Sequence, residues 1–358
     1  MGSALIDEIL SSSNDTVYAL VRGKNAVDAE KRLMTILEKL FDSHELDTRK
    51  RNRIKICVGD ITRRNLGLDK ETFRHLIDKI DTIYHSAAIT DLNWPLEKIR
   101  KINVGGTKNV LNFAIMCRKS GRLKKVNHIS TAYIAGIKRS IFKENHLDVD
   151  QEFNNTYEQS KYEAEVLVSK YRKKNLDIDI FRPGIIMGRY KDGKTIKFKM
   201  LYQPLHFFAL ELFNKIPVVK DGRAYLINVD IVARTILLIN SLPNKLPMNY
   251  HIVSPEIPSL NYVLDIASEY FGLKKPEFVP SEEFDIHKEY SPIKRKMIEP
   301  YLPYLNCITE FTMENTLKQL KRANFTFPRF DEKNLIRLFK YCDKVGFIKR
   351  KKKNVTVR

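Results

Sequence analysis

A tyrosine and a lysine four residues apart, Tyr157 and Lys161, have the spacing in this sequence that best suits acid–base chemistry. Residues at positions i and i+4 lie on the same face of a helix. We therefore expect the lysine ammonium to stabilise the phenolate of a tyrosine whose ordinary pKa is about 10. Two hydroxyls, Ser130 and Thr131, follow a strand-like run and can hydrogen-bond and polarise a substrate oxygen. These four side chains predict a site that gives a proton to a carbonyl or takes one from an alcohol.

The tyrosine–lysine pair carries little weight alone, because the chain has 16 tyrosines and many lysines. The competing interpretation is a surface helix with a partly buried tyrosine. Catalysis is favoured by the strand-end hydroxyls and by Asn103, which lies on an expected helix and is placed to orient Lys161 through a water. The hydride would come from a bound cofactor, so the protein needs only this acid and its positioning.

Strand-like and helix-like segments alternate along the first half of the chain and predict a doubly wound α/β fold. The β-branched runs are at 16–21, 54–58, 82–85, 125–129 and 177–181. Segments with helical period separate them at 26–41, 96–117 and 160–171. Strands separated by helices form a parallel sheet with right-handed crossovers.

The pattern loosens after Pro183, which indicates a change of domain. We expect helices at 205–213, 230–241, 260–271 and 308–323, and a strand at 248–253. The chain is therefore expected to hold a Rossmann-type nucleotide-binding domain over 1–183. A smaller substrate-binding subdomain, interleaved with it, would cover 184–345, and a basic C-terminal tail would cover 346–358.

Three features at the ends of expected strands predict a nucleotide site, because nucleotides bind at the carboxyl ends of the strands in such sheets. Arg22 follows the first run, where an acidic residue would bind a ribose 2′-hydroxyl and an arginine accommodates a 2′-phosphate. It therefore favours NADPH over NADH. Asp60 follows the second run, where a carboxylate can accept a hydrogen bond from an adenine amino group. The small residues Ser86, Ala87 and Ala88 follow the third and let backbone approach the ribose and phosphates. Each feature alone is common in ordinary loops.

The glycine-rich loop that should accompany these features is mostly absent from the sequence. A dinucleotide site needs G-x-G-x-x-G or a variant between the first strand and the first helix. Here residues 2–10 already have the pattern of that helix, and Gly2 stands where the last glycine should be. The alternative is a plain N-terminal helix that never followed such a loop. A missing first strand would leave unpaired strand edges and remove backbone donors for the pyrophosphate. We therefore expect these 358 residues to fold poorly and to bind NADPH poorly.

The composition is that of a globular protein, with 43% hydrophobic and 30% charged residues. No apolar run approaches the ~20 residues of a transmembrane helix, and no signal peptide is visible. The four cysteines are scattered without metal-binding spacing, which predicts reduced thiols, no metal site and a cytoplasmic location.

The formal net charge of +20 does not by itself predict nucleic-acid binding, because the basic residues are spread along the chain beside glutamates. The exception is the basic run 349–353. It is expected to be a solvated tail, with weak contact to an anionic membrane as the alternative. A positive field would also suit a phosphate-rich cofactor or a phosphopantetheine-type substrate.

Taken together, the sequence resembles an extended short-chain dehydrogenase/reductase, within the group of thioester reductases and fatty acyl-CoA reductases. The resemblance covers residues 1–345, and HISTAYIAG with YEQSK is its most specific pair of motifs. The segments that carry it are VYALVRG (17–23), VGDIT (58–62), IYHSAAIT (83–90), INVGGTKNVL (102–111), HISTAYIAG (128–136), YEQSK (157–161), FRPGIIMG (181–188), NVDIVA (228–233) and YHIVSP (250–255).

The resemblance implies roles for particular residues. Thr131, Tyr157 and Lys161 correspond to the catalytic hydroxyl, acid and lysine of the family. The family reduces an acyl thioester, carried by coenzyme A or a carrier protein, to an aldehyde and sometimes to an alcohol, which implies a role in lipid metabolism. Members carry a strand and a TGxxGxxG-type loop before the first helix, and this sequence departs from them there. Residues expected at the NADPH site are Gly2, Arg22, Asp60, Ile61, Ser86, Ala87, Ala88, Asn103, Tyr157, Lys161, Pro183 and Gly184, the last two placed near the nicotinamide by the resemblance.

Two other functions remain open. A sugar-nucleotide epimerase or dehydratase, or a sterol-type dehydrogenase, would have the same fold. The sugar enzymes commonly keep NAD and prefer an acidic residue where Arg22 stands. The aromatic residues Phe207, Phe208 and Phe213 also suit an acyl chain better than a sugar diphosphate, although they are equally typical of a helix core. The third possibility is an inactive truncated remnant or binding module.

Overall fold

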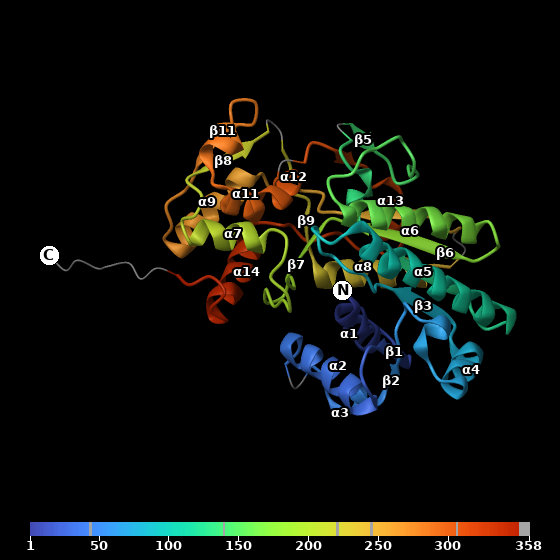
Figure 1. Ribbon diagram of the computed structural model, residues 1–358. Coiled ribbons are helices and arrows are strands. Elements are labelled where there is room, and N and C mark those ends of the chain that lie inside the picture. Colours follow the sequence, from blue (N-terminus) through green and yellow to red (C-terminus); the bar gives the residue numbers. More distant parts are fainter. Residues whose placement is uncertain (43–44, 139, 220–221, 244–245, 306, 351–358) are drawn as a thin grey trace. The chain divides into compact units, whose positions relative to one another are not determined.

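A computed structural model describes residues 1–42, 45–138, 140–219, 222–243, 246–305 and 307–350 (Figure 1). The chain forms two compact units. The first contains Met1–Pro183, Val232–Ile252 and Phe311–Thr326. The second contains Gly184–Ile231, Val253–Glu310 and the chain from Phe327 onward. The first break therefore falls between Pro183 and Gly184, and two later segments return to the first unit.

The first unit contains parallel strands in two groups. The four-stranded group has the order β10-β6-β4-β3, and β1 pairs with β2 alone. All these pairs are parallel, as the alternation of strands and helices predicts. Among the described residues β1 and β3 each have a strand partner on one side only. The strands are β1 (Val17–Val21), β2 (Ile54–Val58), β3 (Thr82–His85), β4 (Lys125–Ile129), β6 (Ile178–Pro183) and β10 (Asn249–Ile252).

Several helices of the first unit begin where the sequence provides a cap. The Asn25, Asp69 and Asn155 side chains each accept a hydrogen bond from a backbone N–H of the first turn that follows. Figure 1 shows α5 and α6 running side by side across one face of the strands. The helices are α1 (Gly2–Ser12), α2 (Ala26–Leu40), α3 (Thr48–Asn52), α4 (Lys70–Lys79), α5 (Leu96–Lys119), α6 (Thr156–Arg172), α8 (Val229–Ser241) and α13 (Glu314–Arg322), with short 3-10 turns η1 (Arg64–Gly67) and η2 (Ala132–Ala135).

Burial differs sharply between β4 and β6 in the centre and β1, β2 and β3 beside them. Every residue of β4 and β6 is buried, whereas most residues of β1, β2 and β3 are only partly buried or exposed. Val126 and Ile180 from the strands pack with Leu111 of α5 and Val168 of α6 in one apolar core. A strand buried on both faces is typical of the middle of a parallel α/β sheet, so β4 and β6 are the rigid centre that positions the residues at their ends.

The second unit is built from short strands and helices. Its strands pair in parallel as β7 with β9 and β11 with β8. The bounds are β7 (Ile185–Met187), β8 (Lys215–Val218), β9 (Leu226–Asn228), β11 (Glu277–Pro280), α7 (Tyr202–Ala209), α9 (Leu260–Phe271), α10 (Ile286–Glu289), α11 (Pro292–Ile298), η3 (Glu299–Tyr301), α12 (Leu302–Leu305) and α14 (Glu332–Lys344). The remaining strands, β5 (Ile141–Phe142) and β12 (Glu310–Phe311), pair with each other.

Three segments differ from the sequence expectations. The helix expected at 205–213 ends at Ala209, and Glu211 has a left-handed φ of 55° that no helix can continue through. The helix expected at 308–323 begins at Glu314, because the chain before it forms β12. The chain also stays packed beyond residue 346, where the basic tail was expected to begin, since Ile348 is 2% exposed and Phe347 stacks on Phe198.

None of the helices in the described ranges has the length and apolarity needed to cross a membrane. Cys57, Cys117, Cys307 and Cys342 are all buried, and none of them forms a disulfide. Lys349 and Arg350 of the basic run are exposed, and residues 351–353 lie outside the described ranges.

Candidate active site

The tyrosine and the lysine lie in the first two turns of α6. Asn155 caps this helix by accepting a hydrogen bond from Glu158 N at 3.1 Å. Tyr157 is half-buried, and Lys161 is 4% exposed. The Lys161 ammonium donates from Nζ to the backbone oxygen of Ile129 at 2.9 Å, at the carboxyl end of β4. The helix therefore delivers Lys161 to the end of β4, whose residues are all buried.

The hydroxyl of Thr131 lies near the phenol of Tyr157 at this point and acts to lower its pKa. Thr131 is 5% exposed and also donates to the backbone oxygen of Pro183 at 3.4 Å, at the end of β6. Ser130 N donates to Phe181 O at 2.7 Å, and the Ser130 hydroxyl is buried without a hydrogen-bond partner among the described residues. Of the two hydroxyls, Thr131 is therefore the one that lies near the tyrosine.

Burial controls the ionisation of this pair. It raises the pKa of Tyr157 well above 10, against the nearby hydroxyl of Thr131, which lowers it, and the negative charge of Glu158 raises it further. Burial also lowers the pKa of Lys161 to about 8, although the charge of Glu165 opposes that shift. The net shift of the Tyr157 pKa is therefore upward and not downward, as its pairing with Lys161 had led us to expect, because desolvation of the phenol dominates. The phenol is protonated at neutral pH and can serve as an acid.

Asn103 ties α6 to the loop after β3. Its Nδ2 donates to Ser160 Oγ at 2.9 Å and to Ile89 O at 3.0 Å, while its Oδ1 accepts from Ile89 N at 2.8 Å. Ser160 Oγ in turn donates to the backbone oxygen of Tyr157 at 2.8 Å. The sequence predicted that Asn103 orients Lys161 through a water. The direct bonds instead hold the turn of α6 that carries Tyr157.

Arg22 and Asp60 lie together at the carboxyl ends of β1 and β2, whose last residues are paired as Val21 with Val58. Burial alone would raise the pKa of Asp60. Two hydrogen bonds from Thr62 and the charges of Arg22 and Arg63 outweigh it, so the pKa is lowered and the carboxylate is charged at neutral pH. The exposed guanidinium of Arg22 is available to an anionic group at this edge.

The start of α1 lies beside the end of β3. A Cβ placed on Gly2 would be 3.2 Å from Ser86 Oγ, so a larger residue would crowd this loop. Ala87 is exposed and Ala88 is half-buried in the same loop. Ile61 differs from the other cofactor candidates, because its side chain is 9% exposed and belongs to the apolar core below α5.

Pro183 and Gly184 lie where the first unit gives way to the second. The backbone oxygen of Pro183 accepts from Thr131, as described above. Gly184 begins the second unit, where a Cβ would be 2.3 Å from Tyr225 O, so only glycine fits. Among the described residues there is no group of three His, Cys, Asp or Glu side chains that could hold a metal ion.

Several buried polar residues around Lys161 were missed from the sequence. His85 and His128 form a ring pair with centroids 5.4 Å apart, and His85 Nε2 lies 2.9 Å from Thr107 Oγ1. Burial, helped by the charge of Lys161, lowers the pKa of His85 to about 3 and that of His128 well below its usual range, so both are neutral. The signal was available: polar residues inside a central strand are unusual where apolar runs are expected.

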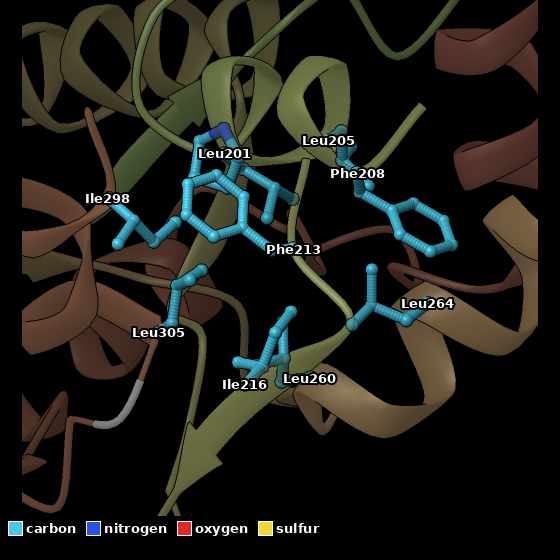
Figure 2. Close-up of a pocket in the computed structure, with 10 residues that line it drawn as sticks. Leu201, Leu205, Phe208, Phe213, Ile216, Leu260, Leu264, Ile298 and Leu305 are labelled. Carbon is cyan, nitrogen blue, oxygen red and sulfur yellow. The ribbon is translucent and has the colours of Figure 1, made fainter. Parts of the chain in front are cut away.

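The second unit contains an apolar pocket between α7, β8, α9, α11 and α12 (Figure 2). Its volume is ≈ 330 Å³, counted with the open space at its mouth, and the side chains leave little of this free. Phe208 and Phe213 line it, whereas Phe207 is only partly buried and packs against Phe213 and Tyr301. The lining is wholly apolar: Leu201, Pro204, Leu205, Phe208, Phe213, Ile216, Leu260, Leu264, Ile298 and Leu305.

Known proteins resemble the chain in sequence and in fold. The nonribosomal peptide synthetase asaC of Aspergillus flavus is 26% identical over 324 residues, which cover 87% of this chain and 30% of that protein. The terminal R domain from the myxalamid PKS-NRPS biosynthetic pathway superposes with a TM-score of 0.82 at 23% identity, over 98% of this chain and 89% of that one. A thiolation-reductase di-domain from an archaeal non-ribosomal peptide synthetase gives 0.74 at 23% identity, over 97% and 74%.

The same fold also occurs in enzymes of other activity. UDP-glucuronic acid 4-epimerase from Bacillus cereus superposes with a TM-score of 0.67 at 17% identity, over 96% of both chains. Solved structures at these identities therefore show the fold alone. The chain spans only 7% to 30% of the length of the first curated relatives that it matches.

The family is settled by a sequence profile. The profile described as "Male sterility protein", a nicotinamide-dinucleotide-binding family, matches residues 1–236. Residues 1–236 include every strand of the first unit's parallel groups except β10, together with Thr131, Tyr157 and Lys161. The chain therefore belongs to this family, within the extended short-chain dehydrogenase/reductases of the thioester-reductase and fatty acyl-CoA reductase group.

Proposed function

We propose that the chain reduces acyl thioesters with NADPH and that Tyr157 supplies the proton. The observation that carries the proposal is that Lys161 is bonded to Ile129 O at the end of β4, two residues before Thr131, on the helix whose first turn carries Tyr157. A phenol that stays protonated at neutral pH, beside a second hydroxyl, is the arrangement needed to bind and protonate one carbonyl oxygen. The coarser conclusion, an oxidoreductase fold that uses a nicotinamide cofactor, follows from the family.

The cofactor and the protein supply different parts of the reaction, the hydride and the proton. NADPH, when bound, supplies the hydride that adds to the thioester carbonyl carbon. Thr131 donates a hydrogen bond to the carbonyl oxygen, and the O–H proton of Tyr157 passes to that oxygen as negative charge develops on it. The resulting hemithioacetal loses the thiol and leaves an aldehyde. A second round on the aldehyde would give the alcohol.

Lys161 acts on the tyrosinate that remains after proton transfer. With a pKa of about 8 the lysine is mostly cationic at pH 7. A buried phenolate is costly without a nearby positive charge, so the ammonium lowers the cost of the step that leaves Tyr157 negative. Asn103 and Ser160 keep the turn that carries Tyr157 in position.

The substrate and cofactor preferences rest on two further features. Arg22, exposed at the end of β1 beside Asp60, suits the 2′-phosphate of NADPH. The apolar pocket of the second unit suits an acyl chain, for which its side chains would have to move apart. A net charge of +20 favours an anionic carrier, either a carrier protein with its phosphopantetheine or coenzyme A. We place the protein in the cytoplasm, in lipid metabolism.

The test is Tyr157→Phe, measured as thioester-dependent oxidation of NADPH. A lost general acid lowers the rate by about 10²–10⁴-fold. Tyr162→Phe is the matched control, because Tyr162 lies on the same helix, is half-buried and packs against Phe153. Unchanged oxidation in Tyr157→Phe would rule out the assigned acid.

The competing functions predict different results in the same assay. A sugar-nucleotide epimerase or dehydratase would turn over UDP-sugars with NAD, and a sterol-type dehydrogenase would oxidise a sterol. Arg22 argues against the first. An inactive remnant would show no turnover with any of these substrates and no binding of NADPH. Assaying thioester, UDP-sugar and sterol side by side therefore separates the three.

A further inference from the structure

One buried carboxylate of the first unit binds two segments that are far from it in the chain. Glu144 lies two residues after β5 and is 3% exposed. Its Oε1 accepts from His251 N at 2.9 Å, from Thr316 N at 3.1 Å and from the Thr316 hydroxyl at 2.7 Å. Its Oε2 accepts from Asn315 N at 2.5 Å. Both oxygens are therefore fixed by groups from β10 and from the first turn of α13.

The backbone of Glu144 binds a third segment, the end of β6. Its carbonyl oxygen accepts from Arg182 Nη1 at 3.1 Å. The same guanidinium is paired with Glu165 of α6, with Nη2 2.7 Å from Oε2, so Arg182 is held from both sides. Arg182 directly precedes Pro183, whose backbone oxygen accepts from Thr131. Glu144 thus also holds the end of the strand that contacts the candidate active site.

Glu144 acts as the missing cap of α13. Met313, the residue before this helix, makes no side-chain bond to its first turn. Asn315 and Thr316 are the second and third residues of the helix, and N–H groups at these positions have no partner inside a helix. An oxygen of the capping residue normally accepts from them, and negative charge is favourable at this end. Glu144 supplies both from a position 171 residues before Asn315.

The three segments that Glu144 binds lie where the chain passes between the two units. The chain leaves the first unit after Pro183 and after Ile252, and it returns at Phe311. The residues of β6, β10 and α13 that bond to Glu144 lie within five residues of these points. Glu144 thus meets three of the five crossings, the other two being before Val232 and after Thr326.

Packing around Glu144 joins the same crossings. The ring of Phe142, two residues earlier, has its centroid 5.5 Å from the Arg182 guanidinium and 5.9 Å from the ring centroid of His251. Phe142 belongs to β5, which pairs with β12, the strand that contains the third crossing. Hydrogen bonds and ring contacts therefore gather the three crossings around one short segment of the first unit.

We propose that Glu144 is the anchor of these three crossings, so that the second unit is attached to the first through one stiff connection and not through independent linkers. The carboxylate suits this role because its partners are N–H and O–H groups with fixed places in a strand and a helix. Glu144 is a positioning residue and touches no reacting atom. The inference rests on the proposed function only in the use of the connection, since the proposed acyl pocket and Tyr157 belong to different units.

The test weakens the anchor with little change of shape. Glu144→Gln keeps the size of the side chain but replaces one oxygen by an NH₂ group, which cannot accept from a backbone N–H. Thr316→Val removes one bond to the carboxylate and leaves Glu144 in place, so it serves where Glu144→Gln does not fold. The matched control is Glu314→Gln, which makes the same charge change at the same end of α13 on an exposed side chain.

The readout is the distance between the two units, measured by pulsed electron paramagnetic resonance. Lys108→Cys on α5 and Glu269→Cys on α9 provide exposed label sites, one in each unit, and the four native cysteines are buried. Circular dichroism checks that each variant is folded, and neither measurement needs cofactor or turnover. We expect one narrow distance distribution in the labelled parent and in Glu314→Gln. Glu144→Gln and Thr316→Val should broaden it.

Unchanged distributions in folded Glu144→Gln and Thr316→Val would overturn the inference, and so would a broad distribution in the parent. Kinetics then separate the inference from the proposed function. With a weakened anchor the KM for the thioester should rise, while the Kd of NADPH, whose expected site lies at strands of the first unit, should not change. If the parent reduces no thioester, the proposed function fails and the distances still decide on the anchor. If the distributions broaden while KM stays the same, the anchor stands and its use in substrate binding fails.

Discussion

Asn103 Nδ2 donates to Ser160 Oγ over 2.9 Å and so joins two helices at residues 57 positions apart in the chain. Asn103 is 1% exposed, and its other bonds fix both backbone groups of Ile89. The asparagine therefore links the loop after β3, where the nucleotide is expected, to the turn of α6 that carries Tyr157. Loss of this link should affect the fold and the site together.

We expect Asn103→Ala to lower the free energy of unfolding by about 1–3 kcal/mol for each buried polar group left without a partner. The rate of thioester reduction should fall as well, because Tyr157 would be less well positioned. Urea unfolding and steady-state kinetics measure the two effects. Asn112→Ala is the control, since Asn112 is on the same helix but exposed, and accepts a single bond from Tyr171. Equal effects of the two substitutions would contradict the linking role.

Reversal of charge at Arg22 should change the cofactor preference. Arg22→Glu removes the partner of a 2′-phosphate and provides an acceptor for a 2′-hydroxyl. A charge-assisted bond is worth about 1.5–3 kcal/mol, so NADPH affinity should fall by roughly tenfold or more while NADH affinity rises. Titration of both cofactors by tryptophan fluorescence or calorimetry measures this. Lys24→Glu makes the same charge change two residues away on an exposed side chain and should leave the NADPH:NADH ratio nearly unchanged.

Activity and stability should respond to alkaline pH in opposite directions. Burial lowers the pKa of Lys161 from 10.5 to about 8, so kcat/KM should fall above about pH 8 as the ammonium is lost. The unfolded chain keeps its proton up to about 10.5, so between these values it binds more protons than the folded protein. The contribution of Lys161 to stability is therefore least favourable below pH 8 and improves from pH 8 toward 10.5. Comparing urea unfolding of the wild type and Lys161→Met at several pH values isolates this contribution. If the contribution of Lys161 to stability became less favourable from pH 8 toward 10.5, its pKa would not be lowered by burial.

Two adjacent glycines of α5 should respond oppositely to alanine. A Cβ on Gly106 would lie 2.5 Å from Ile61 Cδ1 and 2.9 Å from its Cγ1, whereas a Cβ on Gly105 has its nearest neighbour at 3.8 Å. Gly105→Ala should stabilise the protein by about 0.5–1 kcal/mol through helix propensity. Gly106→Ala should destabilise it, because overpacking costs about 1–3 kcal/mol. Thermal unfolding of the two variants measures both changes in stability. Stabilisation by both substitutions would mean that Ile61 does not pack against α5.

The apolar pocket of the second unit can be tested through Phe213. This ring is 4% exposed and meets Tyr290 edge-on with centroids 5.0 Å apart. Phe213→Ala should cost about 3–5 kcal/mol, as for other buried aromatic truncations. Leu210→Ala, three residues earlier and 55% exposed, should stay within about 0.5 kcal/mol of the wild type. Chemical denaturation measures both, and a small effect of Phe213→Ala would show that the pocket is not part of a packed core.

Local signals in the sequence determined most of the elements that form the site. The ranges expected for β2, β3 and β4 are the observed ones, because β-branched runs ending in glycine, small or hydroxyl residues show where a buried strand stops. Helix ends were less secure: nothing local in 205–213 shows that Glu211 takes a left-handed conformation.

The charge states of the site residues and the contacts that fix their side chains became visible only in the folded chain. Tyr157 has a raised rather than a lowered pKa because desolvation depends on what surrounds the ring, which spacing along a helix does not reveal. The partners of Asn103 and Glu165 lie on other elements, so neither Ser160 nor Arg182 could be paired with them from the sequence. The sequence by itself thus determined the chemical groups and the strands that present them. Packing between distant segments determined which groups are buried, which of them remain charged, and which contacts hold their side chains in place.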